Sequence, residues 1–475
     1  MAGLAVVRVR HRPDRRRRRR WGVHVSSDLR SWLDVLDGRG ELARLGSPID
    51  PDQDVAAVLT RADGRRAVRF GDVIGAEFPL VGNTVPSRTH LGLVLGCEPA
   101  GVADRFAAAL DAPERCPEVE ASGAPVLANR MHGDRMLSAL PLTRQHSEDG
   151  GRYLTSALLA VRDPVSGRMN LSINRLLAAG ERELRALLLP GRLRRIFAEA
   201  EAVGRDLDVA LVVGVHPALV LASQSPADRE LDDYAVANAL APPVELVAAP
   251  TVDALVPARA EFVLEGRFRA GRREAEGPFG EYPRTYGPGG PAPVIELLDG
   301  WHRDDAVFQT ILSGGREHFY AGGVPREAAC LRALRRAGLD VAALRLPESG
   351  SCRLTAVVAL RDPAPGAPTT AMMTLFLTAS TIKQVTVVDD DVDITDDEQV
   401  AWAVATRTQP DRDLLVVPNA KGSSLDPSAE QGLTAKLGLD ATVPAADRDR
   451  YRQMTVAPTD PSALERHLAE LGDLR

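Results

Sequence analysis

The sequence has little of the features that mark secreted, membrane-spanning or nucleotide-binding proteins. Its four cysteines, Cys97, Cys116, Cys330 and Cys352, are scattered and form no CxxC pair. This pattern favours reduced thiols in the cytoplasm over a disulfide framework or a zinc site. No apolar run approaches the roughly 20 residues that span a bilayer. The chain also contains neither a GxGxxG fingerprint after a predicted strand nor a Walker A motif.

The charge balance does not support nucleic-acid binding by the main part of the chain, because the formal net charge is -7 and the pI is about 5.8. The exception is the N-terminus, where arginines fill positions 15–20. Like charges repel and bury no core, so we predict a disordered basic tail over residues 1–27. An arm for nucleic acid or an anionic surface, and an upstream choice of start codon, are the alternatives. The tail lacks the apolar segment of a secretory signal.

The length of 475 residues predicts two to four domains, at roughly 150 residues per domain. Apolar periodicity predicts a first α/β unit over residues 28–127, with a helix over residues 29–45 and a strand over residues 67–70. Many short β-rich runs between residues 128 and 320 predict a barrel or a sandwich-like sheet. Strands and helices alternate again after residue 321, which predicts a parallel-rich α/β unit.

Two carboxylates lie five residues apart in Glu276-Gly-Pro-Phe-Gly-Glu281. A regular strand or helix would not direct both at one site. The glycines and the proline between them supply a kink, because glycine reaches backbone angles closed to other residues and proline fixes its own. Converging carboxylates need a cation beside them, and their pKa values then separate into an acid and a base. The candidate cation is Arg175, about a hundred residues upstream.

Five segments carry a family resemblance: Asp149-Gly-Gly-Arg-Tyr-Leu-Thr155, Asn170-Leu-Ser-Ile-Asn-Arg175, Val256-Pro-Ala-Arg-Ala-Glu-Phe-Val-Leu-Glu-Gly266, Glu276-Gly-Pro-Phe-Gly-Glu281 and Lys383-Gln-Val-Thr-Val-Val-Asp-Asp-Asp391. In this order they resemble the UbiD-type decarboxylases, which include ferulic acid decarboxylase and use prenylated FMN. The resemblance covers nearly the whole chain from about residue 28. It implies an α/β (α+β multidomain) protein with an N-terminal α/β domain, a central split β-barrel flavin-binding domain over residues 128–320, and a C-terminal α/β oligomerisation domain over residues 321–475.

The resemblance implies three catalytic residues. Arg175 matches the active-site arginine, Glu276 the glutamate paired with it, and Glu281 the glutamate that delivers or removes a proton. A guanidinium offers carboxylates a planar fork and keeps its charge at any working pH, so Arg175 would bridge Glu276 and the substrate carboxylate. Glu281 would need a raised pKa in a dry pocket. The implied reaction is the non-oxidative, reversible decarboxylation of an α,β-unsaturated or aromatic carboxylic acid through a covalent prenylated-FMN adduct.

In this family a divalent ion, commonly manganese, holds the flavin phosphate, with potassium nearby; magnesium is the alternative ion for this chain. Asn170 matches one metal ligand, and Asp233 matches a glutamate ligand if one residue is missing before Pro243. The expected histidine falls at Leu193, so this ligand is absent; water, a more loosely held ion or the charge of Arg192 are the alternatives. The residues predicted to bind the cofactor are Thr155, Asn170, Ser172, Ile173, Arg175, Arg192, Ser223, Gln224, Ser225, Asp233 and Lys383.

The resemblance also implies partners. A flavin prenyltransferase would supply the cofactor, and the chain would form a homodimer or a higher homo-oligomer in the cytoplasm, with no membrane or nucleic-acid partner. The missing histidine motivates an alternative function. The chain would then be a UbiD-like flavin-binding protein without decarboxylase activity, or a plain FMN protein.

Overall fold

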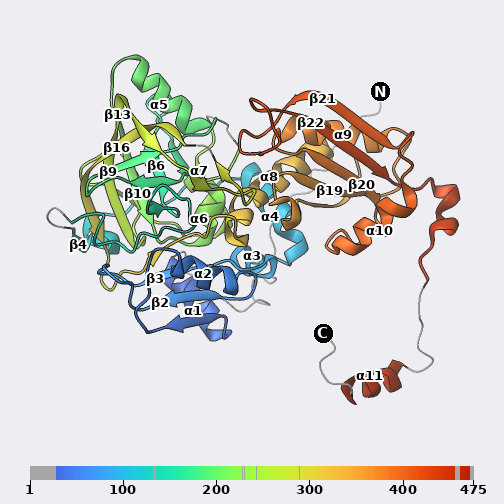
Figure 1. The fold of residues 1–475 in the computed structure, drawn as a ribbon, viewed down its shortest axis with the longest axis horizontal. Coiled ribbons are helices and arrows are strands. Elements are labelled where there is room, and N and C mark those ends of the chain that lie inside the picture. Colours follow the sequence, from blue (N-terminus) through green and yellow to red (C-terminus); the bar gives the residue numbers. More distant parts are fainter. Residues whose placement is uncertain are drawn as a thin grey trace, which may run out of the picture.

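The computed structural model describes residues 28–131, 135–226, 228, 230–241, 243–287, 289–454 and 461–470, so the predicted basic tail lies outside it. The elements form three groups (Figure 1). An N-terminal group lies below a central sheet, and a C-terminal sheet lies beside it, with helices α4 (Val102–Asp111) and α8 (Arg316–Arg336) between the two sheets. No helix in the described part of the chain has the length and apolarity needed to cross a membrane. The four cysteines are free, as expected from their scatter.

The N-terminal group is a small mixed sheet with helices packed on it. Asp28 caps the first helix by accepting the Ser31 N–H at 2.9 Å. The helix predicted over residues 29–45 ends at Gly38, because Leu42–Leu45 forms a strand that pairs in parallel with Ala67–Phe70. The sheet order is β1-β2-β3-β17, so its last strand comes from the central segment. The elements are α1 (Leu29–Gly38), β1 (Leu42–Leu45), α2 (Asp54–Ala62), β2 (Ala67–Phe70), β3 (Leu80–Gly82), α3 (Arg88–Leu95) and α4 (Val102–Asp111).

The central group is a nine-stranded antiparallel sheet. Its pairing follows the order β5-β8-β9-β16-β13-β10-β6-β7, with β4 on β16. Among the described residues no pairing joins β5 to β7, so the sheet is open and does not close into a barrel. The elements are β4 (Asn129–Arg130), β5 (Tyr153–Leu154), β6 (Leu158–Arg162), β7 (Met169–Ile173), β8 (Leu176–Ala178), β9 (Glu183–Ala186), α5 (Arg192–Ala202), β10 (Leu207–Val213), α6 (Pro217–Ala222), α7 (Asp233–Leu240), β11 (Leu246–Ala248), β12 (Leu255–Pro257), β13 (Phe262–Glu276), β14 (Phe279–Gly280), β15 (Tyr286–Gly287), β16 (Gly290–His302) and β17 (Phe308–Gln309).

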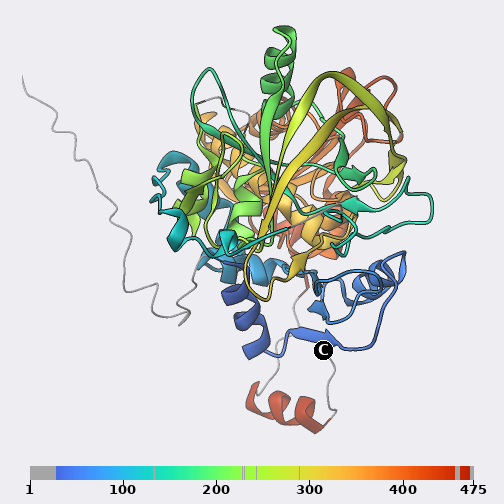
Figure 2. The same ribbon diagram turned by 90° about the vertical axis from the view of Figure 1, so that its left-hand side faces the viewer.

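Strands β13 and β16 form the longest ribbon of this sheet, which Figure 2 shows as two long curved arrows. Two register shifts, between Glu265 and Gly266 and between Phe268 and Arg273, interrupt their pairing. Such irregularities bend a ribbon and increase its twist. Strand β13 ends at Glu276, so the far end of this ribbon carries the first carboxylate of the Gly-Pro motif.

The C-terminal group is a five-stranded mixed sheet with the order β18-β19-β20-β22-β21. Its central pairs are parallel, as predicted, but both edge strands are antiparallel, and the sequence did not predict β21 or β22. Helix α8 contains Pro325 in its interior. The elements are α8 (Arg316–Arg336), β18 (Val341–Arg345), β19 (Thr355–Leu360), α9 (Ala367–Thr378), β20 (Gln384–Asp389), α10 (Asp397–Arg407), β21 (Leu414–Lys421), β22 (Leu433–Ala441) and α11 (Pro461–Glu470).

Candidate active site

A buried guanidinium joins the two carboxylates of the Gly-Pro motif. Arg175, in the turn between β7 and β8, donates from Nη1 to Oε1 of Glu281 at 2.6 Å and from Nη2 to Oε2 of Glu276 at 2.7 Å. All three side chains are buried. Charge-assisted bonds of this length in a dry environment hold their partners firmly. The structure therefore brings the three residues predicted to be catalytic into one contact.

The backbone between the two glutamates is tightly constrained. Gly277 has a φ of +87°, a conformation that L side chains rarely adopt, and a Cβ there would lie 2.8 Å from the Cα of Gly289. A Cβ on Gly287 would lie 3.0 Å from Glu281 Cγ and 3.1 Å from Arg175 Nη1. Glycine at position 277 therefore permits the close backbone approach to Gly289, and glycine at position 287 leaves room for the ion pair.

We expect Gly277→Ala to destabilise the protein by about 2–4 kcal/mol, because it adds a backbone clash to the cost of a positive φ. Gly271→Ala is the matched control, since Gly271 lies in β13, which ends just before Gly277, with a φ of +71° and no atom within 4 Å of an added Cβ. It should cost about 1 kcal/mol, the conformational part alone. Urea denaturation of both variants measures the difference, and equal losses would contradict the close approach to Gly289.

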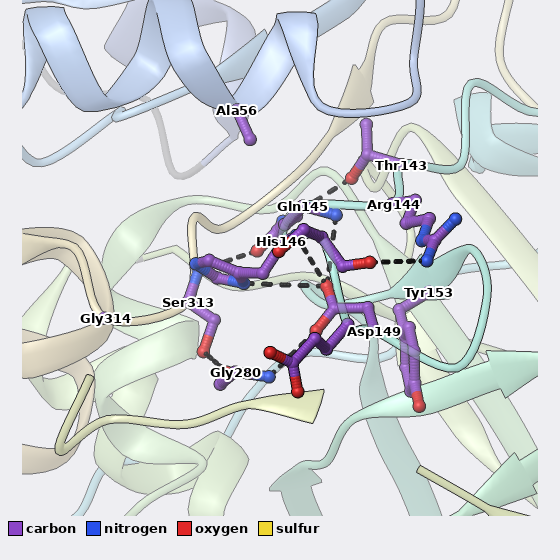
Figure 3. Close-up of polar contacts among 12 residues, drawn as sticks. Ala56, Thr143, Arg144, Gln145, His146, Asp149, Tyr153, Gly280, Ser313 and Gly314 are labelled. Atoms are coloured by element: carbon purple, nitrogen blue, oxygen red, sulfur yellow. Dashed lines mark hydrogen bonds and ion pairs between the residues drawn. The ribbon is translucent and has the colours of Figure 1, made fainter. Parts of the chain in front are cut away.

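The carboxylate of Asp149 holds the second half of the motif (Figure 3). It accepts the backbone N–H of Gly280 at 2.9 Å and that of His146 at 2.8 Å, while Ser313 Oγ donates to the Gly280 carbonyl. Burial alone would raise the pKa of Asp149, but the bonds from His146 and Gly280 lower it. A charged Asp149 thus fixes the backbone just before Glu281.

The environments of the two glutamates differ. Burial raises the pKa of Glu281, and the positive charge of Arg175 opposes this rise without cancelling it. Glu276 instead accepts a second bond, from the Tyr153 hydroxyl at 3.1 Å. Burial, and then the charge of Glu276, raise the pKa of Tyr153, so the hydroxyl remains a neutral donor. Glu281 is therefore suited to hold and release a proton, and Glu276 to orient Arg175.

Glu281 and Arg175 line a cavity of about 180 Å³ between the central sheet, helix α8 and the C-terminal sheet. Two further arginines line it, Arg326 from α8 and Arg353 from the segment before β19. Among the described residues neither is ion-paired with a carboxylate, although Arg353 is only 7% exposed and its Nη1 has no hydrogen-bond partner. Burial, reinforced by the charge of Arg353, lowers the pKa of Arg326 to about 10, and burial also lowers the pKa of Arg353. Both guanidiniums are nevertheless charged at neutral pH, because arginine is not deprotonated in proteins.

A groove of about 630 Å³ opens beside this cavity. Seven lining residues are common to both, so they form one continuous space: Ile173, Asn174, Leu189, Gln224, Arg326, Thr381 and Ser423. Most residues predicted to bind the cofactor line the groove, namely Asn170, Ser172, Ile173, Arg192, Ser223, Gln224 and Ser225. Thr155 and Arg175 line the adjoining cavity. The described lining of the groove contains four cationic side chains, Arg192, Arg194, Arg326 and Lys421, and no carboxylate.

Two residues predicted to bind the cofactor lie outside the lining of both spaces. The ammonium of Lys383 binds Asp426 at 3.0 Å and Ser428, so its charge is used within the C-terminal sheet. Lys421, at the end of β21, lines the groove instead. Asp233 lies behind the lining, where it is fully buried.

The residues at the expected metal position do not fit a three-ligand divalent site. Arg192 Nη2 donates to both carboxylate oxygens of Asp233 at 2.5 Å, and the Leu171 N–H donates to Oδ2 at 2.8 Å. Leu193 is apolar and buried. Of Asn170, Leu193 and Asp233, Asn170 alone has a buried side-chain oxygen, Oδ1, with no hydrogen-bond partner among the described residues. Across the described residues no cluster of three His, Cys, Asp or Glu could hold a metal.

Three family models match the chain in the order of its three groups. They are the N-terminal, Rift-related and C-terminal domains of 3-octaprenyl-4-hydroxybenzoate carboxy-lyase, matched over residues 33–110, 117–316 and 319–441. The chain belongs to the UbiD family. The predicted family and the mixed α/β fold are thereby confirmed.

Curated and solved UbiD proteins match along almost their full length. The chain is 34% identical to anhydromevalonate phosphate decarboxylase of Methanothermobacter thermautotrophicus, covering 90% of this chain and 99% of that protein. HmfF of Pelotomaculum thermopropionicum, solved with FMN, is 40% identical with a TM-score of 0.89 over 93% of this chain and 99% of that one; an evolved dimeric form was solved with prFMN. Klebsiella pneumoniae 3,4-dihydroxybenzoic acid decarboxylase is 27% identical with a TM-score of 0.87, covering 93% and 99% of the two chains.

Sequence reasoning missed several residues of the UbiD site. The glycines of Gly287-Pro-Gly-Gly290 were assigned no role, although their density is a signal for close backbone approach. Asp149 stands in a motif that was noticed, but no role was assigned to it. Arg326 and Arg353 gave no local signal, because only the tertiary fold brings them to the cavity.

Proposed function

We propose that the chain is a prenylated-FMN-dependent decarboxylase acting on an α,β-unsaturated or aromatic carboxylic acid. The observation that carries this proposal is the buried contact of Arg175 with Glu276 and Glu281, beside a cavity that continues into a groove whose described lining contains no carboxylate. The groove suits an anionic cofactor, and relatives solved with FMN and prFMN support a flavin. Membership of a carboxy-lyase family supports the reaction type.

The chain's own residues divide the work. Arg175 orients the substrate carboxylate, and Glu276 with Tyr153 fixes its guanidinium. Burial raises the pKa of Glu281. Glu281 transfers its proton to the carbon that loses carbon dioxide, and it regains a proton from solvent. When bound, prenylated FMN would supply an electrophilic ring, which accepts the electron pair left on the substrate carbon when carbon dioxide departs. The asparagine, serines and cations of the groove would hold its ribityl and phosphate end.

The substrate is proposed to carry a second anionic group. Arg326 and Arg353 line the cavity with charged guanidiniums that no carboxylate among the described residues neutralises. Uncompensated buried charges are costly, and a ligand anion removes that cost. One relative is named for a substrate that bears a phosphate besides its carboxylate. An acid with one carboxylate would leave both arginines unpaired and should bind more weakly.

Coexpression with a flavin prenyltransferase tests the proposal. We expect purified protein to carry prenylated flavin, recognised from its absorption spectrum and mass. It should release carbon dioxide from unsaturated or aromatic acids, with kcat/KM about 10–100-fold higher for those with a second anionic group. Bound flavin without carbon dioxide release from any such acid would favour a flavin-binding protein without decarboxylase activity. Unmodified FMN as the bound species would favour a plain FMN protein.

We further propose the domain boundaries 28–127, 128–320 and 321–475, the last serving in a homodimer or higher homo-oligomer, and a cytoplasmic location. The dimeric form solved for HmfF supports the assembly. A flavin prenyltransferase would be the functional partner.

A further inference from the structure

We propose that this chain holds its flavin phosphate without a divalent metal, and that Arg192 takes the ion's place as the counter-charge of Asp233. This inference rests on the proposed flavin function. It starts from the contact in which both oxygens of Asp233 accept from Arg192 Nη2. Asp233 is 0% exposed, so its negative charge needs a partner inside the protein. The guanidinium faces both oxygens of this carboxylate, where a metal ion would bind, and its positive charge repels a second cation.

The guanidinium of Arg192 is fixed from its other side as well. Nη1 donates to the carbonyl oxygens of Leu231 at 3.0 Å and of Asp228 at 3.3 Å. These carbonyls belong to the segment that leads into helix α7, whose first residue is Asp233. Arg192 thus ties the start of α5 to the start of α7, a structural task that a bound ion would otherwise perform.

The exchange of an ion for an arginine changes the local charge. A divalent ion with one aspartate leaves one net positive charge facing the phosphate, whereas the Arg192–Asp233 pair is neutral. Other groups must therefore neutralise the phosphate. Arg194 and Lys421 are exposed, line the same groove and have no ion-pair partner among the described residues. Helix α5 begins there after Gly191 with no side-chain cap, so its first N–H groups also suit a phosphate.

Two buried polar atoms indicate that a ligand completes this end of the groove. Among the described residues, Asn170 Oδ1 has no hydrogen-bond partner although Asn170 is only 4% exposed, and the shielded Oγ of Ser172 has none either. Both residues line the groove. The ribityl chain of a flavin carries hydroxyl groups, which donate to an amide oxygen and accept from a serine. A bound flavin therefore satisfies these atoms without an intervening metal.

Binding of FMN to the full-length protein, stripped of flavin and treated with EDTA, tests the proposal. We expect the Kd values in EDTA and in added MnCl₂, measured by flavin fluorescence, to agree within about threefold, because an anchoring ion would contribute about 10–100-fold. Elemental analysis of the flavin-loaded protein should find no stoichiometric manganese or magnesium. Tight binding only with metal, or one ion per flavin, would overturn this inference alone. No FMN binding under either condition would overturn the proposed cofactor as well.

Three variants sharpen the test. Arg192→Gln leaves Asp233 without its counter-charge, so FMN affinity in EDTA should fall about tenfold or more and added manganese should restore it. Arg192→Gln with Asp233→Asn is neutral like the native pair, and should keep metal-independent binding. Arg194→Gln is the matched control, because it removes a charge from the groove without freeing Asp233: affinity should fall, and manganese should not restore it. Restoration in the control, or none in Arg192→Gln, would contradict the role of Arg192.

Discussion

Replacement of Glu281 by glutamine is expected to abolish decarboxylation while flavin stays bound. Glutamine has nearly the same shape and still accepts from Arg175 Nη1, which now bonds Glu281 Oε1 at 2.6 Å. It cannot carry the exchangeable acidic proton that the reaction needs. General acid catalysis contributes about 10²–10⁴-fold, so we expect kcat to fall by about 10³-fold or more. Carbon dioxide release and the flavin content of the same preparation are the two measurements.

Glu317→Gln is the matched control, because Glu317 is also a buried glutamate but lies outside the cavity lining, with Thr84 as its partner. Its kcat should stay within a few-fold of wild type. The wild-type pH profile provides an independent check. Since burial raises the pKa of Glu281, the protonated form persists to higher pH, and kcat should decline as pH rises through that raised pKa. Substantial turnover by Glu281→Gln would remove Glu281 from the proton transfer.

The short-range pattern of the sequence predicted most elements, because apolar periodicity reports which face of a helix or strand is buried. The prediction from apolar periodicity failed where a residue fits the pattern of both a helix and a strand. Leu42 continues the helical spacing of α1, yet it lies in a parallel strand beside Ala67. Strands β21 and β22 were missed, and their pairing with each other and with β20 is a tertiary choice that no local pattern encodes.

The candidate site was predictable only where its residues stand in recognisable motifs. Glu276, Glu281 and Arg175 lie in such motifs, and their contact agrees with the expected convergence around a cation. Residues distant from these motifs gave no such indication. Lys383 was expected to bind the cofactor, but its ammonium binds Asp426, and Lys421 lines the groove instead. The two lysines carry the same charge in the sequence, and only the tertiary fold determines which of them contacts a carboxylate.

Replacement of Arg175 by methionine is expected to cost both activity and stability, because it leaves Glu276 and Glu281 buried without a cation. Removal of one partner from a buried ion pair costs about 3–5 kcal/mol, and here two carboxylates lose the same partner. At least one of them should then hold a proton at neutral pH, since close like charges in a dry site cannot both ionise. The stability deficit should therefore shrink as pH falls and the carboxyls become neutral. Urea denaturation at two pH values measures this change.

Arg152→Met supplies the control for this pH-dependent loss. Arg152 binds Asp52 at 2.7 Å, the same distance as Arg175 to Glu276, but its side chain is 45% exposed against 5% for Arg175. An exposed pair contributes about 0–1 kcal/mol, so Arg152→Met should change little at either pH. Arg175→Lys separates charge from geometry: it keeps the cation but not the fork, so most of the stability should return while kcat stays about 10²-fold low. Full activity in Arg175→Lys would mean that charge alone suffices, and that the two bonds which aim Glu276 and Glu281 at one site have no catalytic role.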